Sequence, residues 1–190
     1  MAQVHNRDEF AAKEKVLIEQ LKESVFVYPT DTIYGIGCNA LDEVLVNKVR
    51  DIKQRHTLPF SVIAPGKAWI REHCVVDAKA EEWLEKLPGP YTLVMELKDP
   101  KMIPDAVNMG LGTLAVRIPD CWFSEVVRKM KMAIVTTSTN LTGQNHMTSL
   151  DDLHPSIRKN VAHIIYTDEL KGRPSTIVRL DTEDFELRER

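Results

Sequence analysis

The sequence lacks the features of disulfide-stabilised, zinc-binding and membrane-spanning proteins. Its cysteines are Cys38, Cys74 and Cys121, which are far apart and form no CxxC pair, so we expect neither a disulfide framework nor a zinc site. No apolar run approaches the roughly 20 residues that a membrane-spanning helix needs, and the polar start MAQVHNRDEF does not resemble a secretory signal. These absences predict a soluble, cytoplasmic protein with reduced thiols.

A basic excess and the familiar nucleotide and metal motifs are also missing. The chain has 25 Lys and Arg against 28 Asp and Glu, so its total charge gives no indication of generic nucleic-acid binding, although a local basic patch stays possible. It contains no GxxxxGK[ST] or GxGxxG, and its histidines show no spacing such as HExxH. We therefore assign no role to any histidine and identify no metal site made of side chains.

The chain of 190 residues, of which 43% are hydrophobic, is long enough for one domain with a substantial core. Hydrophobic periodicity predicts helices over 8–24, 41–52, 77–87 and 120–130, with Asp42, Asp77 and Asp120 as N-caps. Predicted strands cover 25–29, 60–65, 91–97, 113–119, 133–137, 163–167, 175–180 and 185–189. This alternation predicts a single α/β domain over 1–190, with a mixed sheet flanked by helices.

Polar residues recur where predicted strands end. The stretch VYPTDTIYGIGCNA places Thr30-Asp31-Thr32 directly after a strand, and similar clusters surround Arg117 and cover 136–143. A fourth cluster, KGRPST, precedes a strand. Each cluster alone could be a turn or a helix cap, and Asp31 could either touch a ligand or brace its loop. Their recurrence favours a binding site, because ligands in such sheets tend to sit at the carboxyl ends of strands.

Lys53 and Arg55 stand at the end of a predicted helix and admit two interpretations. Cations near a helix C-terminus are stabilised by the helix dipole, which needs no ligand. Alternatively, if the backbone there is extended, side chains at i and i+2 point the same way and could straddle a polyphosphate. Lys would supply a compact charge and Arg a bidentate contact.

Six short segments follow one another along most of the chain: YPTDTIYGIGCNA, KQR, LPGPYTLVM, LAVRIPD, TTSTNLTG and RPSTIV. Their succession resembles the YrdC-type family, the L-threonylcarbamoyladenylate synthases. The resemblance implies a twisted mixed sheet with a concave basic face. It also implies formation of threonylcarbamoyl-AMP and pyrophosphate from L-threonine, bicarbonate or CO2, and ATP with Mg2+. A threonylcarbamoyl-transfer complex acting on tRNA would then consume the product.

The resemblance also implies roles for individual residues. Those expected to contact L-threonine are Thr32, Tyr34, Arg117, Ser138 and Ser175. Those expected to contact ATP are Lys53, Arg55, Thr113, Asn140, Thr148 and Arg188, with Lys53 and Arg55 as the catalytic pair facing the phosphates. Gly35 and Gly37 would let the backbone approach the ligand without a Cβ clash.

Two alternatives remain open. One is a paralogue of this fold that binds nucleotide or double-stranded RNA without making the adenylate. The other is a binding module whose concave basic face holds structured RNA through its phosphates. The intact KQR, PGPYT and STN segments favour the synthase.

Overall fold

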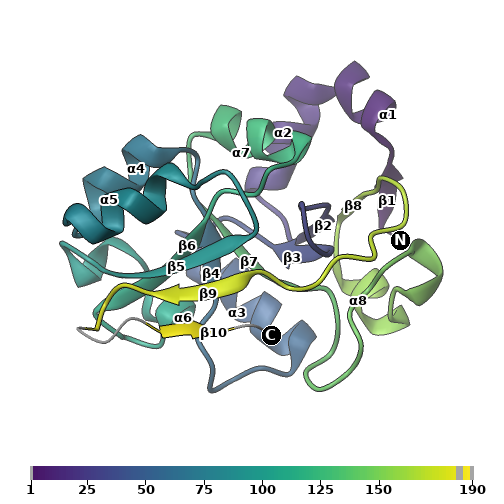
Figure 1. Cartoon of the computed structure of the whole chain (residues 1–190). Coiled ribbons are helices and arrows are strands. Elements are labelled where there is room, and N and C mark those ends of the chain that lie inside the picture. Colours follow the sequence, from purple (N-terminus) through teal and green to yellow (C-terminus); the bar gives the residue numbers. More distant parts are fainter. Residues whose placement is uncertain (1, 183–185, 189–190) are drawn as a thin grey trace.

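The computed structural model describes residues 2–182 and 186–188. Its strands form one sheet in the order β1-β8-β2-β3-β7-β4-β6-β5-β9-β10 (Figure 1). The strands are β1 Gln3–His5, β2 Phe26–Tyr28, β3 Gly35–Gly37, β4 Ser61–Ile63, β5 Tyr91–Glu96, β6 Thr113–Arg117, β7 Ile134–Ser138, β8 His163–Ile165, β9 Thr176–Arg179 and β10 Glu186–Arg188. The α-helices are α1 Arg7–Ala12, α2 Glu14–Lys22, α3 Glu43–Lys53, α4 Lys67–His73, α5 Ala78–Glu85, α6 Asp105–Asn108, α7 Trp122–Met130 and α8 Pro155–Asn160. Short 3-10 turns cover Pro100–Met102 and Leu150–Asp152.

The sheet is mixed, as predicted. β8 runs parallel to both β1 and β2, and β4 runs parallel to β6. β3 is antiparallel to both of its neighbours, β2 and β7. Because β2 and β3 are consecutive and antiparallel, the loop between them turns back at the sheet edge where β7 ends. That arrangement brings the cluster Thr30-Asp31-Thr32 close to the cluster at 136–143.

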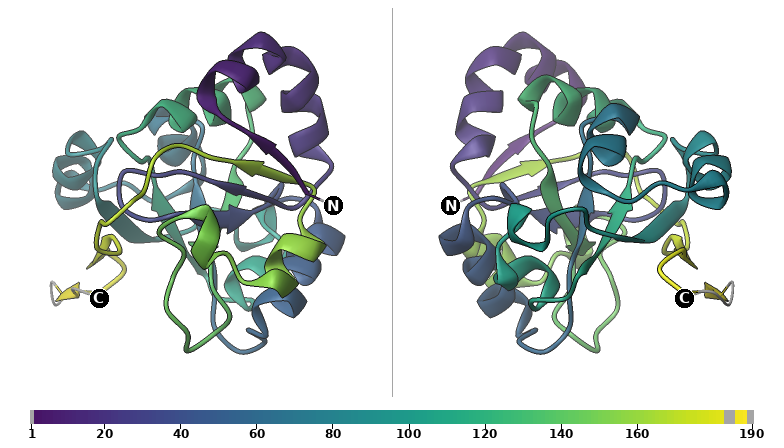
Figure 2. Two further views of the ribbon diagram at one scale, coloured as in Figure 1. Left: turned by 90° about the vertical axis from the view of Figure 1, so that its right-hand side faces the viewer. Right: turned by 90° about the vertical axis from the view of Figure 1, so that its left-hand side faces the viewer.

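Helices cover both faces of the sheet (Figure 2). On one face α1, α2 and α7 bury a cluster that includes Phe10, Leu21 and Phe123 against the strand residues Phe26 and Tyr28. On the other face the apolar sides of α3, α5 and α8 pack into the larger cluster. This double covering removes apolar strand residues from water, which is the main stabilising term for such a fold.

Two of the three predicted N-caps are confirmed. The Asp42 carboxylate accepts the amide proton of Leu45 at 3.0 Å, and the Asp77 carboxylate accepts that of Ala80 at 2.7 Å. The prediction for Asp120 was wrong, because α7 begins one residue later and its N-cap, Cys121, makes no side-chain capping bond. Asp120 instead donates its backbone N–H to the carboxylate of Asp31 in the loop between β2 and β3.

The predicted helix over 8–24 is two helices with a break at Lys13, whose backbone leaves the helical region at φ −124° and ψ 20°. The break turns α1 so that Phe10 meets the rings of Trp122 and Phe123 edge-on. Sequence patterns did not predict β1, β3, α4, α6 or α8. The longest of these has seven residues, too short for a hydrophobic period to stand out.

Candidate active site

The four polar clusters meet at one cavity of about 160 Å³. Its walls come from the β2–β3 loop, the ends of β6 and β7, the loop after β7 and the segment before β9. The lining residues are Thr30, Ile33, Tyr34, Gly35, Ser61, Arg117, Thr136, Thr137, Ser138, Asn140, His146, Pro174 and Ser175. The strand-end pattern therefore predicted the place of the cavity from residues up to 145 positions apart in the sequence (Thr30 to Ser175).

Arg117 is the buried cation of this cavity and is only 5% exposed. It is the last residue of β6 and pairs with Ile63 of β4, which in turn pairs with Ile134 of β7. Both isoleucines belong to the core beneath α7. Because paired residues share a face of a sheet, Arg117 continues this apolar face into the cavity. Burial lowers the pKa of the guanidinium, while the nearby Asp31 carboxylate raises it.

Asp31 braces the loop between β2 and β3. Its Oδ1 accepts a bond from Arg117 Nη2 at 2.5 Å, and its Oδ2 accepts the backbone N–H of Asp120 at 2.9 Å. Thr32 adds Oγ1, which lies 3.3 Å from Arg117 Nη1 and 3.4 Å from Nη2. These contacts tie the β2–β3 loop to the end of β6. The structure thus gives Asp31 a bracing contact, one of the two roles left open by the sequence.

Tyr34 is one of the residues that line the cavity, while its hydroxyl is used elsewhere. The hydroxyl lies 3.1 Å from the Thr167 carbonyl and 2.9 Å from the Asp168 carbonyl, and it accepts the Thr167 N–H at 3.0 Å. The ring stacks on Tyr166 with centroids 5.7 Å apart. Burial raises the pKa of Tyr34, which keeps the phenol protonated as a fixed structural donor.

Lys53 does not point out of an extended segment as the phosphate interpretation required. It is the last residue of α3, and the following Gln54 adopts a left-handed conformation. Lys53 is 1% exposed, and its ammonium donates to the Ser138 carbonyl, to the Asn140 carbonyl at 2.8 Å and to Asn140 Oδ1 at 3.0 Å. Burial, aided by the Arg55 charge, lowers the pKa of Lys53 to about 7. Lys53 therefore holds the loop after β7 from beneath.

Arg55 contacts one of the residues that line the same cavity. Its Nη1 lies 3.5 Å from Oγ1 of Thr137, a lining residue, and its Nη2 donates to the Pro59 carbonyl at 2.9 Å. The guanidinium also lies over the Phe60 ring, 5.5 Å from its centroid. Lys53 and Arg55 thus diverge: Lys53 supports the loop after β7 from inside, and Arg55 contacts Thr137 and the Pro59 carbonyl.

The serine hydroxyls of the cavity are held in place by neighbouring side chains. Ser138 Oγ donates to Asn140 Oδ1 at 2.6 Å, and Asn140 in turn donates from Nδ2 to the Gln144 carbonyl at 2.6 Å. On the opposite wall, Ser175 and Thr92 share a hydroxyl–hydroxyl bond of 2.7 Å. Such networks fix the donors and acceptors that an incoming polar ligand would meet.

Thr113 and Thr148, both expected to contact ATP, are not among the residues that line this cavity. Thr113 begins β6, at the opposite end of the strand from Arg117, and it is absent from the lining. The Thr148 hydroxyl donates to Asp152, the last residue of a short turn whose N-cap is Ser149. Arg188 pairs through its backbone with Ile177 in the β9–β10 ladder, and its side chain lies outside the described part of the structure.

The sequence did not predict that His146 lines the cavity or that internal packing requires Gly35 and Gly37. His146 reaches the cavity, but a single histidine in a polar loop carries no spacing signal. Gly35 and Gly37 serve internal packing: a Cβ at Gly35 would lie 2.8 Å from the Tyr28 ring, and one at Gly37 would lie 1.8 Å from the Val135 carbonyl oxygen. These positions need glycine whether or not a ligand is present.

Comparison with protein families identifies the fold and its relatives. The model of the Sua5/YciO/YrdC family, which carries the description "Telomere recombination", matches residues 20–189. The chain belongs to this family. A relative from Methanocaldococcus jannaschii, named a putative threonylcarbamoyl-AMP synthase, is 32% identical over 178 residues, covering 89% of this chain and 83% of its own. A threonylcarbamoyl-AMP synthase from Idiomarina loihiensis is 27% identical over 84% of this chain and 87% of its own.

Solved structures of family members share the whole fold. Sua5 from P. abyssi, solved in complex with L-threonine, has a TM-score of 0.86 at 25% identity, covering 98% of this chain. The match spans 56% of that Sua5 chain, so Sua5 is much longer. YciO from E. coli has a TM-score of 0.86 at 21% identity and matches nearly end to end, covering 96% of its own chain. At that identity YciO shows the fold alone.

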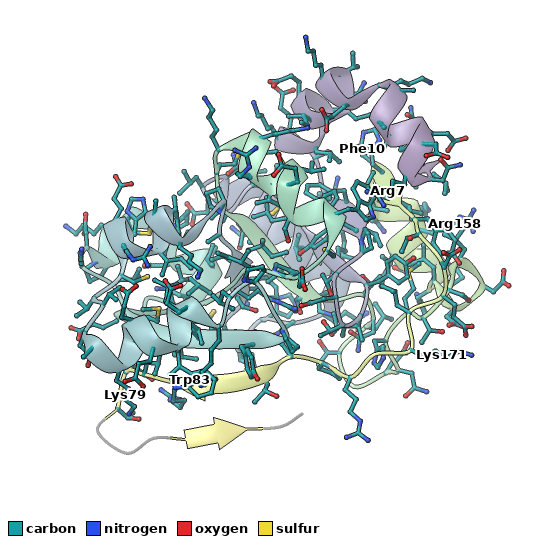
Figure 3. The ribbon with its side chains drawn as sticks, turned by 45° about the horizontal axis from the view of Figure 1, so that its top comes forward. Arg7, Phe10, Lys79, Trp83, Arg158 and Lys171 are labelled. Carbon is teal, nitrogen blue, oxygen red and sulfur yellow. The ribbon has the colours of Figure 1, made fainter. Side chains whose placement is uncertain are left out.

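Other kinds of site are not evident in the described residues. No group of three His, Cys, Asp or Glu within residues 2–182 and 186–188 could hold a metal ion. None of the helices described is both long and apolar enough to cross a membrane. Among the cations labelled in Figure 3, Lys79 lies at the opposite end of the molecule from Arg158 and Lys171, so these three do not form one basic cluster.

Proposed function

We propose that the chain is a threonylcarbamoyl-AMP synthase, which forms threonylcarbamoyl-AMP and pyrophosphate from L-threonine, bicarbonate or CO2, and ATP. The observation that carries the proposal is the gathering of Arg117, Ser138 and Ser175 around one cavity. A carboxylate-binding cation and fixed hydroxyls are what a small hydroxy amino acid requires. The names of the family relatives and the Sua5 complex with L-threonine support the same substrate.

The threonine end of the reaction needs positioning more than a protein nucleophile. We assign the substrate carboxylate to Arg117, and the substrate hydroxyl and amine to the polar wall that includes Ser138 and Ser175. Once the amine has formed a carbamate, the new carboxylate is itself the group that attacks the α-phosphorus of ATP. The chain then contributes orientation and charge stabilisation, which dominate catalysis of phosphoryl and nucleotidyl transfer.

The phosphate end is proposed to use Arg55, whose guanidinium contacts Thr137 of the cavity lining. Lys53 acts indirectly: its ammonium donates to the carbonyls of Ser138 and Asn140 and so positions the loop that carries them. We propose that Mg2+ arrives bound to the phosphates of ATP, with no dedicated side-chain cage. In such a site the metal neutralises charge on the phosphate oxygens.

The proposed product is reactive and implies a partner. A threonylcarbamoyl-transfer complex acting on tRNA is the expected consumer, and direct RNA binding remains a prediction. A paralogue that binds nucleotide or double-stranded RNA without synthesis is the second candidate. The observation in its favour is that Lys53, one of the two expected phosphate contacts, is engaged inside the protein.

Pyrophosphate release from ATP tests the proposal. With Mg2+ present, release is expected to require both L-threonine and bicarbonate, because the carbamate must form before it can attack. Leaving out either one should reduce the rate to background. Release that proceeds equally without threonine contradicts the proposal, and tight nucleotide binding without any release supports the non-synthesising paralogue.

A further inference from the structure

The guanidinium of Arg117 has one edge that is only half used. A guanidinium presents paired N–H groups along its Nη1–Nη2 edge and along its Nη2–Nε edge. Thr32 Oγ1 lies against the first edge, 3.3 Å from Nη1 and 3.4 Å from Nη2. On the second edge Asp31 reaches Nη2 at 2.5 Å, whereas Nε is buried and has no partner among the described residues. A buried donor left without an acceptor is costly.

Arg179 shows what a fully used edge looks like in this protein. There Asp181 accepts from both Nε at 3.1 Å and Nη2 at 2.5 Å, which is a bidentate contact. Asp31 makes no such contact with Arg117: only its Oδ1 reaches the guanidinium, at Nη2, while its Oδ2 accepts the backbone N–H of Asp120 at 2.9 Å. The pairing of Asp31 with Arg117 is therefore a single-point contact between two nearly buried groups, with side chains 10% and 6% exposed.

A free carboxylate entering the cavity could use the whole edge. Arg117 lines the cavity, and a ligand carboxylate could accept from Nε and Nη2 together in a parallel fork. That exchange would replace one charge-assisted bond with two and would satisfy the orphaned Nε. Asp31 would meanwhile keep its bond to the Asp120 amide, so its release from Arg117 would not leave it without a partner.

We propose that Asp31 is a stand-in for the substrate carboxylate: it occupies Arg117 in the free protein and must be displaced by the ligand. Asp31 thereby makes a carboxylate a requirement for tight binding, because a ligand without one cannot compete for Arg117. This inference rests on the proposed function for the identity of the ligand, L-threonine. It adds a specificity-determining residue that acts through the arginine.

Calorimetric titration of two matched ligands tests the proposal. L-Threonine and L-threoninol share the amine and the side chain, but threoninol has no carboxylate. Asp31→Asn keeps the size of the side chain and an acceptor for the Asp120 amide while removing the competing charge. We expect this variant to bind L-threonine at least about threefold more tightly than wild type, with threoninol affinity unchanged within about twofold. Its melting temperature without ligand should fall, because Arg117 loses its counter-charge.

Asp181→Asn is the control, since it removes the counter-charge of Arg179 outside the cavity. It should lower stability without changing the affinity for either ligand. If Asp31→Asn does not fold, Asp31→Ser provides a smaller hydroxyl acceptor and carries the same expectation. Equal or weaker threonine binding by the folded variant overturns the stand-in proposal, and so does equal tightening for both ligands. Wild-type protein that binds no L-threonine at all instead contradicts the proposed function.

Discussion

At Arg117 the shape of the cation matters as much as its charge. The guanidinium contacts Thr32 through Nη1 and Nη2 and Asp31 through Nη2, and it still has Nε to offer. Arg117→Lys keeps a positive charge but loses this fork. We expect the variant to bind L-threonine about 10-fold more weakly or worse, which corresponds to about 1.4 kcal/mol.

ATP affinity measured without threonine is the internal control for Arg117→Lys. It should change little, because the nucleotide is assigned to other contacts. Calorimetric titration of each ligand into wild type and variant gives both values. Equal threonine affinity in the two proteins would remove Arg117 from the site.

Lys53 and Arg55 should respond differently to replacement by Ala. Arg55→Ala is expected to weaken ATP binding by about 10-fold or more, the equivalent of one charge-assisted contact, with little change in melting temperature. Lys53→Ala should destabilise the fold by about 2 kcal/mol or more, because three oxygen acceptors at Ser138 and Asn140 lose their donor.

Urea unfolding of both variants, beside calorimetric titration with ATP, separates these two effects. If Lys53→Ala unfolds at the same urea concentration as wild type, the bracing role assigned to Lys53 is wrong. An Arg55→Ala variant with ATP affinity within twofold of wild type would leave Arg55 as a helix-end feature.

The individual site residues were predictable to different degrees. The convergence of Arg117, Ser138 and Ser175 followed from their place at strand ends, which meet at one edge of a sheet. The direction of Lys53 did not follow, because one left-handed residue, Gln54, ends the helix and separates it from Arg55. A single backbone angle of that kind leaves no periodic trace in a sequence.

At the scale of elements, the edge strand β1 is joined to β8 by a buried histidine pair. His5 Nε2 and His163 Nδ1 lie 3.2 Å apart, and burial lowers the pKa of both rings. Lys13 also lowers the pKa of His5, whereas Glu9 raises it. In the unfolded chain a histidine titrates near 6.5, so below that pH the unfolded state binds protons that the folded state does not. The free energy of unfolding should therefore have its full value above about pH 6.5 and should decrease as the pH falls below that value.

Replacing one member of the pair tests its share of this pH dependence. His5→Gln keeps a hydrogen-bonding side chain but cannot titrate, so its free energy of unfolding should fall less steeply between pH 7 and pH 5. Urea unfolding at several pH values gives the slope. His56→Gln, at an exposed position, should keep the wild-type slope. An unchanged slope in His5→Gln would show that the pair does not govern acid sensitivity.

The elements themselves show which local signals are reliable. Asp42 and Asp77 precede strong hydrophobic stripes and cap their helices as predicted. Asp120 had the same local appearance, but α7 begins one residue later and the Asp120 amide is used by Asp31, 89 residues away in sequence. A contact over that distance depends on tertiary structure, which local capping rules do not contain.

At the scale of the whole molecule, the sheet order explains why one cavity collects four distant loops. β3 and β7 lie side by side, β4 separates β7 from β6, and β5 joins β6 to β9. The alternation of helices and strands predicted the layers and the mixed sheet. It could not predict this order, because each pairing depends on which apolar faces fit together across the core.

The central claim is that this cavity joins threonine, carbon dioxide and ATP into one product. Its most direct test is incubation of the protein with carbon-labelled bicarbonate, L-threonine, ATP and Mg2+, followed by separation of the products. The label should enter a compound that also contains adenylate and should do so only when threonine is present. A labelled adenylate product that forms without threonine, or none at all from folded protein that binds both ligands, would contradict the claim.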